Sequence, residues 1–189
     1  PVLVAERLGL QISFQPRQFT DVLADFKAGR TRIILNAGWP NPLLKSAGAV
    51  PTVPYAYFEP VVFRHAGEEA QTQVQERHTF AGQRLAFQSG SYTEHCMEGV
   101  EVSMTPVEND IQGIAKLIWH QVDGVVTERR VGSHISTRFF HGEIEIASTT
   151  CSEVDVVMAL HRDDAELLSS INEALRDPAI IAVVDEWRS

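Results

Sequence analysis

The stretch HTFAGQRLAFQSGSYTEHCMEG, His78 to Gly99, places a strand pattern directly before a helix-like segment. Arg84–Gln88 is a short strand-like segment with three apolar residues between two polar ones, small residues then break the pattern, and helical character begins at about Thr93. Free N–H groups at the start of a helix favour an anion, and Gly90 would let a ligand approach the backbone. The alternative is an ordinary turn capped by Ser or Thr. The stretch therefore predicts either an anion-binding turn or a capped turn.

Strand-like and helix-like segments alternate on both sides of this stretch, which predicts an α/β fold with mostly parallel strand pairing. The expected strands cover 31–38, 55–65, 84–88, 100–104, 122–126, 143–148 and 155–161. The expected helices cover 19–26, 127–136 and the segments that follow Asn109, Asp163 and Asp177. Residues 36–54 are expected to form a loop, and the polar residues 66–77 divide the chain into two α/β units.

Three of these helices carry recognisable patterns. Asn109 is expected to cap a helix with one apolar face, made of Ile111, Ile114, Ala115 and Ile118. Asp163 and Glu166 are spaced as in a capping box. Pro178 follows Asp177 in the position that a first helical turn tolerates.

The composition excludes several classes of protein. The chain has 189 residues and a formal net charge of −9, so a basic nucleic-acid surface is not expected. No apolar run is long enough to span a bilayer. The histidines lack metal-binding spacing, and the glycine signatures of serine hydrolases and dinucleotide-binding proteins are absent. We therefore expect no metal, no cofactor and no nucleic-acid partner.

The first residues and the two cysteines leave questions open. PVLVAERLGLQISF is typical of the end of a helix that runs into a strand, so we expect the chain to begin inside a fold. Cys96 and Cys151 form either one disulfide or two buried thiols. The thiols are favoured because a free cysteine behaves as a small hydrophobe.

Further candidate site residues lie outside the opening stretch. Asp123 and Glu128 bracket a buried strand, and carboxylates at the carboxyl end of a strand in an open α/β sheet face the ligand crevice. Glu128 is expected either to bind a ligand ammonium group or to cap the next helix. Four aromatic residues are expected either to line a pocket or to pack in the core: Trp39, Tyr55, Tyr57 and Phe58.

Five phrases, in this order along the chain, resemble the family-3 extracellular solute-binding proteins, the periplasmic amino-acid-binding type that also serves as sensor domains. They are FTDVLADFKAGRTRIILNAG, VPYAYFEPVVF, HTFAGQRLAFQSGSYTE, VENDIQGIAKLIWHQVDGVVTER and MALHRDDAELLSSINEALRDPAIIAVVDEW. The resemblance implies a periplasmic binding protein type II-like α/β fold of two lobes joined by two crossover strands. Lobe 1 would comprise 1–60 and 155–189, without its N-terminal elements, and lobe 2 would comprise 61–154.

The resemblance also implies a ligand site. Gly90, Ser91, Tyr92 and Thr93 match the turn that holds the ligand carboxylate, and Glu128 matches the acid that pairs with the ligand ammonium. The lobe-1 segment that meets the ligand matches Asn36, Ala37, Gly38 and Trp39. One departure stands out, because Leu44 takes the place of the arginine that grips the carboxylate in amino-acid binders. Lys45 follows it, and lysine does not replace the planar guanidinium fork.

The function implied is extracytoplasmic, periplasmic binding of a small polar solute, an amino acid or related carboxylate, by hinge closure. The chain would be the solute-binding component of an ABC importer, with a membrane permease as partner and no catalytic residue. An alternative is the ligand-sensing domain of a histidine kinase or other receptor, with a fused signalling module. A minor alternative is a dehydratase-like enzyme in which Glu128 is the acid–base group.

Overall fold

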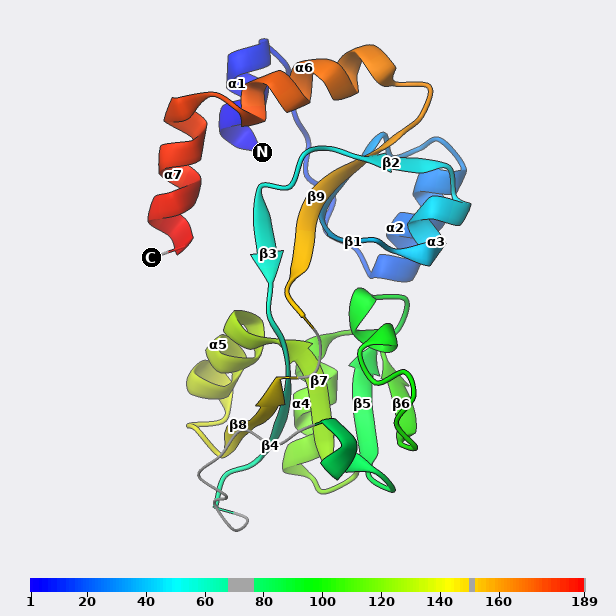
Figure 1. Cartoon of the computed structure of the whole chain (residues 1–189), viewed down its shortest axis with the longest axis vertical. Coiled ribbons are helices and arrows are strands. Elements are labelled where there is room, and N and C mark those ends of the chain that lie inside the picture. Colours follow the sequence, from blue (N-terminus) through cyan, green and yellow to red (C-terminus); the bar gives the residue numbers. More distant parts are fainter. Residues whose placement is uncertain (68–76, 150–151, 189) are drawn as a thin grey trace. The chain divides into compact units, whose positions relative to one another are not determined.

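The computed structural model describes residues 1–67, 77–149 and 152–188. The chain divides into two compact units (Figure 1). The first unit comprises Pro1–Tyr57 and Asp155–Ser189, and the second comprises Phe58–Val154. Each unit has its own sheet and its own helices, so each is described separately.

The sheet of the first unit is built around β9 (Val154–His161), which pairs antiparallel with β1 (Ile33–Trp39) and with β2 (Ala49–Pro51). The short β3 (Ala56–Phe58) also pairs with β9. Because β1 and β2 both oppose β9, they run in the same direction. Both faces of β9 are covered by hydrophobic side chains: Val157 and Ala159 belong to one cluster, and Met158 and Leu160 to another.

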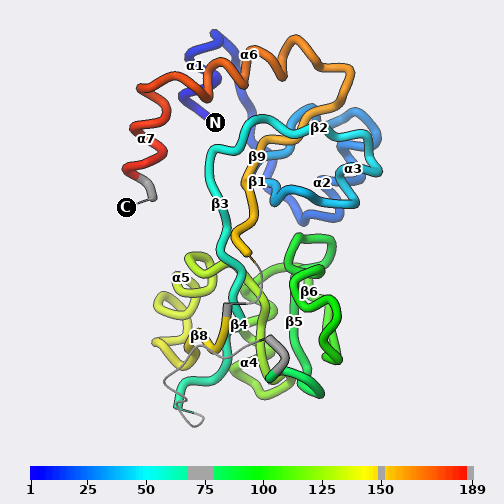
Figure 2. Tube along the Cα trace, viewed as in Figure 1, coloured from blue at the N-terminus to red at the C-terminus, as the bar shows by residue number. Residues whose placement is uncertain are grey.

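Helices supply the rest of these two clusters. The chain of the first unit carries α1 (Val2–Leu8), α2 (Phe19–Lys27), α3 (Pro42–Ser46), α6 (Ala165–Leu175) and α7 (Pro178–Arg188), which Figure 2 traces in order. α2 and α3 contribute Leu23, Phe26 and Leu44 to the cluster on the Val157 face. α1, α6 and α7 contribute Val4, Ile171 and Ile180 to the cluster on the Met158 face.

The second unit has a five-stranded sheet in the order β6 (Ser103–Val107), β5 (Arg84–Gln88), β7 (Gly124–Glu128), β4 (Pro60–His65), β8 (Ile144–Thr149). β5 pairs parallel with β6 and with β7, whereas β4 pairs antiparallel with β7 and with β8. The expectation of mostly parallel pairing is therefore wrong. One reversed strand, β9 or β4, lies inside each sheet and makes its neighbouring pairs antiparallel.

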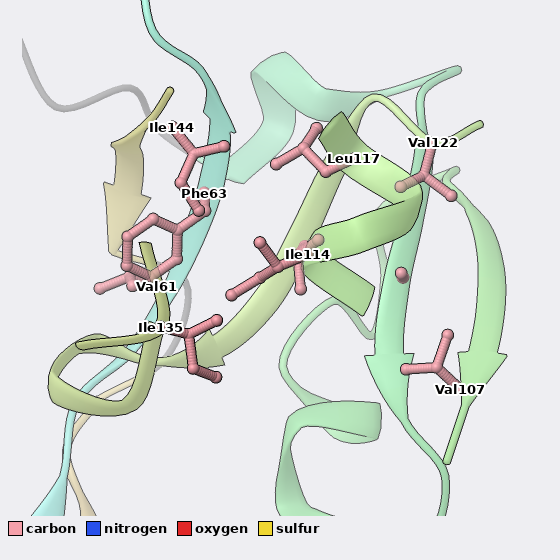
Figure 3. Packing of buried hydrophobic residues seen from close by; sticks show 10 residues of the cluster. Val61, Phe63, Val107, Ile114, Leu117, Val122, Ile135 and Ile144 are labelled. Carbon is pink, nitrogen blue, oxygen red and sulfur yellow. The ribbon is translucent and has the colours of Figure 1, made fainter. Parts of the chain in front are cut away.

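One core cluster of the second unit lies between the sheet and two helices, α4 (Asp110–Ile118) and α5 (Arg129–Phe139), and a second cluster, which includes Val62, Leu85 and Val126, covers the other face of the sheet. Figure 3 shows Phe63 of β4 beside Ile135 of α5, with Ile114 and Leu117 of α4 in the same cluster. α5 lies so close to Phe63 that a Cβ at Gly132 would fall 2.2 Å from the ring atom Cε2. The second unit also contains two 3₁₀ turns, η1 (Arg77–Phe80) and η2 (Tyr92–His95).

Residues 36–54 contain more regular structure than the sequence predicts, since α3 and β2 lie there. The side chain of Asn41 caps α3, because its Oδ1 accepts from the N–H groups of Leu43 at 2.9 Å and Leu44 at 3.2 Å. Pro42 occupies the first turn, which proline tolerates. The prediction of a loop over the whole of this proline-rich segment is therefore wrong.

Of the predicted helix caps, the one at Asn109 is confirmed and the one at Asp163 is wrong. Asn109 caps α4, with its Oδ1 accepting from Gln112 N–H at 2.9 Å, which confirms that prediction. The buried face of this helix is nevertheless Gly113, Ile114 and Leu117, whereas Ile111 is 50% exposed. The capping box at Asp163 is wrong, because α6 begins after Asp164, whose side chain makes no cap bond and instead pairs with Arg32.

Two expectations fall partly on residues that are not described. The polar segment 66–77, which was expected to divide the chain, lies mostly outside the described ranges, and so does Cys151. Cys96 is 1% exposed and disulfide-bonded. The interpretation that favoured buried thiols is therefore wrong for Cys96.

Candidate functional site

The carboxyl ends of three strands meet at one edge of the second sheet. β6 and β7 both run parallel to β5, so Gln88, Val107 and Glu128 end their strands on the same side. Ligands of open α/β sheets bind at this kind of edge. Tyr92 follows β5 and Asp110 follows β6, and both interact electrostatically with residues at the end of β7; we call Tyr92, Asp110, Thr127 and Glu128 the carboxyl-edge cluster.

The turn after β5 is closed by its own hydrogen bonds. Ser91 Oγ donates to Gln88 O at 2.9 Å and accepts from Thr93 N–H at 3.3 Å, and the Ser91 and Thr93 hydroxyl oxygens lie 2.6 Å apart. The Gly90 N–H donates to Glu94 Oε2 at 3.1 Å. The expected helix is a single 3₁₀ turn, η2, capped by Ser91. A carboxylate already lies at the Gly90 amide, and a solute carboxylate would have to replace it there.

Tyr92 links this turn to the acidic residues. Its ring stacks on Phe58, with centroids 5.4 Å apart and planes 16° apart. Its hydroxyl oxygen is buried and has no hydrogen-bond partner among the described residues. Burial raises the pKa of the Tyr92 hydroxyl, and the negative charges of Glu128 and Asp110 raise that pKa further. The hydroxyl is therefore a neutral, unsatisfied group within the electrostatic influence of Glu128 and Asp110.

Glu128 ends β7 and is only 8% exposed. Its Oε2 accepts from Val131 N–H at 2.9 Å, so the side chain caps α5, as one of the two expectations for it stated. The adjacent Arg129 does not neutralise it, because Arg129 makes a two-point ion pair with Glu59, Nε to Oε2 at 2.6 Å and Nη2 to Oε1 at 2.7 Å. That guanidinium lowers the pKa of Glu59.

Asp110 is a member of the cluster that the sequence reasoning missed. It is the first residue of α4, and burial raises the pKa of its carboxyl group. A hydrogen bond with Thr127 opposes this rise in pKa, and the charge of Glu128 adds to it. The argument that selected Glu128 applies equally here, since Asp110 follows a strand parallel to β7.

Asp123 lies at the other, amino end of β7. Its Oδ2 accepts from the backbone N–H of Arg84 at 2.7 Å, and its Oδ1 lies 2.7 Å from Arg84 Nη2. Arg84 lowers the pKa of Asp123 by hydrogen bonding and by charge. Asp123 is therefore a structural ion-pair residue and does not belong to the carboxyl-edge cluster.

The residues expected to meet a ligand in the first unit lie at the end of β1. Ala37 and Gly38 are buried and pair with Val157 and Val156 of β9. Trp39 is part-buried, and the Lys45 Nζ lies 5.5 Å from its ring centroid, a cation–π arrangement.

Leu44, which stands where the amino-acid binders have arginine, is fully buried in the core of the first unit. Just before this end of β1, Asn36 has a φ of +53°. The Tyr55 hydroxyl donates to Asn36 Oδ1 at 2.7 Å and accepts from its N–H at 3.0 Å. Burial raises the pKa of Tyr55 to about 12. Leu44 and Tyr55 are thus engaged inside the first unit.

The described residues hold no group of three His, Cys, Asp or Glu side chains suited to a metal ion. None of the helices within the described ranges combines the length and the hydropathy that crossing a bilayer requires.

Comparisons with known proteins give the fold. No protein-family model and no curated protein matches the sequence. Among solved structures, the substrate-binding protein of an amino acid ABC transporter is 16% identical, with a TM-score of 0.84 over 98% of this chain and 84% of that one. An ancestral arginine-binding protein bound to arginine is 19% identical, with a TM-score of 0.83 over 98% and 83%. An amino acid ABC transporter substrate-binding protein from Streptococcus pneumoniae, bound to L-arginine, is 19% identical, with a TM-score of 0.84 over 98% and 78%. The chain therefore has the fold of these substrate-binding proteins.

Proposed function

We propose that this protein binds a small polar solute, an amino acid or related carboxylate, by hinge closure outside the cytoplasm. In this proposal it is the solute-binding component of an ABC importer and delivers its solute to a membrane permease. The fold is that of amino acid substrate-binding proteins, two of which are described as arginine-bound. The observation that carries the proposal is the carboxyl-edge cluster, because it places ionisable and hydroxyl groups where open α/β sheets bind ligands.

The chemistry of the cluster supports a ligand with an ammonium group. Glu128 is almost fully buried, and none of the described residues forms an ion pair with it. A charge-assisted hydrogen bond from an ammonium to such a carboxylate contributes about 1.5–3 kcal/mol. Trp39, Ala37 and Gly38 are proposed to contact the solute from the first unit, as in the resemblance noted above.

The carboxylate of an amino-acid solute is proposed to bind the turn of Gly90, Ser91, Tyr92 and Thr93. Glu94 competes with it, because the Glu94 side chain accepts from the Gly90 N–H. Replacing Glu94 by alanine is expected to tighten binding of L-arginine about 2- to 10-fold, which corresponds to the net free energy of one hydrogen bond. Isothermal titration calorimetry gives the comparison.

The control for this prediction is Glu101→Ala, which removes an equally exposed negative charge from the same part of the chain. An equal gain in both variants would show a general effect of charge. An unchanged affinity in Glu94→Ala would show that no solute carboxylate binds at the Gly90 amide.

A thermal-shift panel tests the proposed function. The panel contains L-arginine, L-glutamine, the other amino acids, polyamines, and mono- and dicarboxylates. A ligand at 100 times its dissociation constant stabilises the folded state by about 2.7 kcal/mol. For a chain of this size, the melting temperature is expected to rise by about 5–10 °C. A panel without any shift would contradict the proposal.

The sensor alternative begins with the same binding step and differs in its partner, so the panel tests that step for both. The solved structures named above are binding proteins. We accordingly propose no catalytic activity for this chain.

A further inference from the structure

Three oxygen-bearing side chains of the carboxyl-edge cluster come from three different segments of the second unit: Tyr92 from η2, Asp110 from α4 and Glu128 from the end of β7. We propose that Asp110 joins Glu128 and the Tyr92 hydroxyl in one acceptor site for a primary ammonium group of the solute. This inference rests on the proposed function, and it adds Asp110 and Tyr92 as residues that determine the class of solute.

The Tyr92 hydroxyl is the first argument for a ligand. Its oxygen is fully buried and makes no hydrogen bond with any described residue, although the charges of Glu128 and Asp110 act on it. An unsatisfied buried polar group is costly to a folded protein. A solute N–H group that donates to the phenol oxygen would satisfy it. The ring itself is held in place by stacking on Phe58.

The balance of charge is the second argument. Asp110 and Glu128 repel one another, and within the described ranges neither has an ion pair. The nearby Arg129 is held by Glu59. A pair of carboxyl groups without a cation excludes an anionic group from this site and favours a cationic one. The backbone of Asp110 is fixed because Asp110 is the first residue of α4, after the cap Asn109.

The number of acceptors identifies the cation. A primary ammonium has three N–H donors and no acceptor. Asp110, Glu128 and Tyr92 each carry an acceptor oxygen that a bound ammonium could use, while Glu128 Oε2 stays bonded to Val131 N–H. A solute that carries an ammonium fills this set, whereas the same solute without its amine leaves all three acceptors unpaired.

Binding of a cation at this site releases a proton. Asp110 interacts with Glu128 and the Thr127 hydroxyl, both from β7, and with Tyr92 from η2. Burial raises the pKa of Asp110, and the negative charge of Glu128 raises it further. The empty site therefore retains a proton to a higher pH than an ordinary aspartate does. An ammonium in the site displaces this proton, so affinity is expected to rise as the pH rises through the pKa of Asp110 in the folded protein.

The sign of the effect on stability follows from the same shift in pKa. A carboxyl group whose folded-state pKa is raised stabilises the folded state below its unfolded-state pKa, and this contribution is lost as the pH rises through the folded-state pKa. At neutral pH, Asp110→Asn is therefore expected to raise the melting temperature of the ligand-free protein. The gain is expected to disappear below the ordinary pKa of aspartate.

The experiment compares two solutes that differ only in the amine, L-glutamine and glutaramate, by calorimetric titration of the wild-type chain, Asp110→Asn and Glu108→Gln. Glu108 is an exposed acid two positions before Asp110 in the sequence and serves as the matched control. The same titrations with L-arginine and 5-guanidinopentanoate provide a second pair. We expect the wild type and Glu108→Gln to prefer the amine-bearing solute about 10- to 100-fold. Asp110→Asn is expected to lose about tenfold of this preference, together with the pH dependence and the proton release.

The outcomes separate the role of Asp110 from the proposed solute-binding function. If the wild type binds an amino acid and Asp110→Asn binds it with the same affinity and pH dependence, the inference about Asp110 is overturned and the proposed function stands. If the wild type binds none of the four probes, both are overturned. A preference for the amine-bearing solute that survives Asp110→Asn and disappears in Tyr92→Phe would assign the ammonium to Tyr92 and Glu128 without Asp110.

Discussion

Replacing Phe63 by alanine is expected to lower the free energy of unfolding by about 3–5 kcal/mol, as large-to-small changes at buried aromatic residues do. Phe63 is 2% exposed and lies in the main core cluster of the second unit (Figure 3). Its ring fills the space beside Gly132 of α5, which has no side chain to close a cavity. Denaturant unfolding followed by circular dichroism measures the change, with the exposed Tyr57→Ala as the control.

A second substitution tests the same contact from the other side. In the wild type, Gly132→Ala would place a Cβ 2.2 Å from Phe63 Cε2, which no packing tolerates, and such overpacking costs about 1–3 kcal/mol. In the Phe63→Ala background the added methyl enters the cavity and α5 gains helix propensity, so the same change is expected to be neutral or stabilising. Strictly additive effects would contradict the direct contact between Phe63 and Gly132.

Glu128→Gln is expected to weaken binding of L-arginine about 10- to 100-fold, because it removes the charge-assisted part of the bond to the solute ammonium. The amide oxygen of glutamine still accepts from Val131 N–H, so the cap of α5 is retained. Calorimetric titration measures the affinity, and Glu101→Gln is the control for the loss of one negative charge. Wild-type affinity in a folded Glu128→Gln variant would remove Glu128 from the site.

Local patterns predicted those parts of the fold that local interactions determine. The strand at 84–88 follows from a short apolar run between two polar residues, and the cap at Asn109 follows from a side-chain bond to the next turn. The segment 55–65 was predicted as one strand, yet it contains β3 and β4, separated at Glu59. Glu59 is held by Arg129, 70 residues away in the sequence. No local pattern reveals such a contact.

Some residues of the candidate site could be predicted from local patterns, and others depend on contacts between distant parts of the chain. Glu128 could be selected from the sequence because it ends a clear strand pattern, and the departure at Leu44 was visible in the sequence. Asp110 was missed because it meets Glu128 and Tyr92 only through the parallel pairing of β5 with its two neighbours. No local pattern predicted a role for Glu94, whose carboxylate accepts from the Gly90 amide that was expected to hold a solute anion.

Chemical-shift perturbation locates a bound solute residue by residue, so it shows whether an amino acid binds at the carboxyl-edge cluster. A ¹⁵N-labelled sample of the 21.0 kDa chain would be titrated with L-arginine and with L-glutamine. We expect saturable shifts with the largest changes at the amides of Gly90, Thr93, Asp110, Glu128 and Val131. Saturable shifts confined to other residues, or no shift with either amino acid, would contradict this expectation.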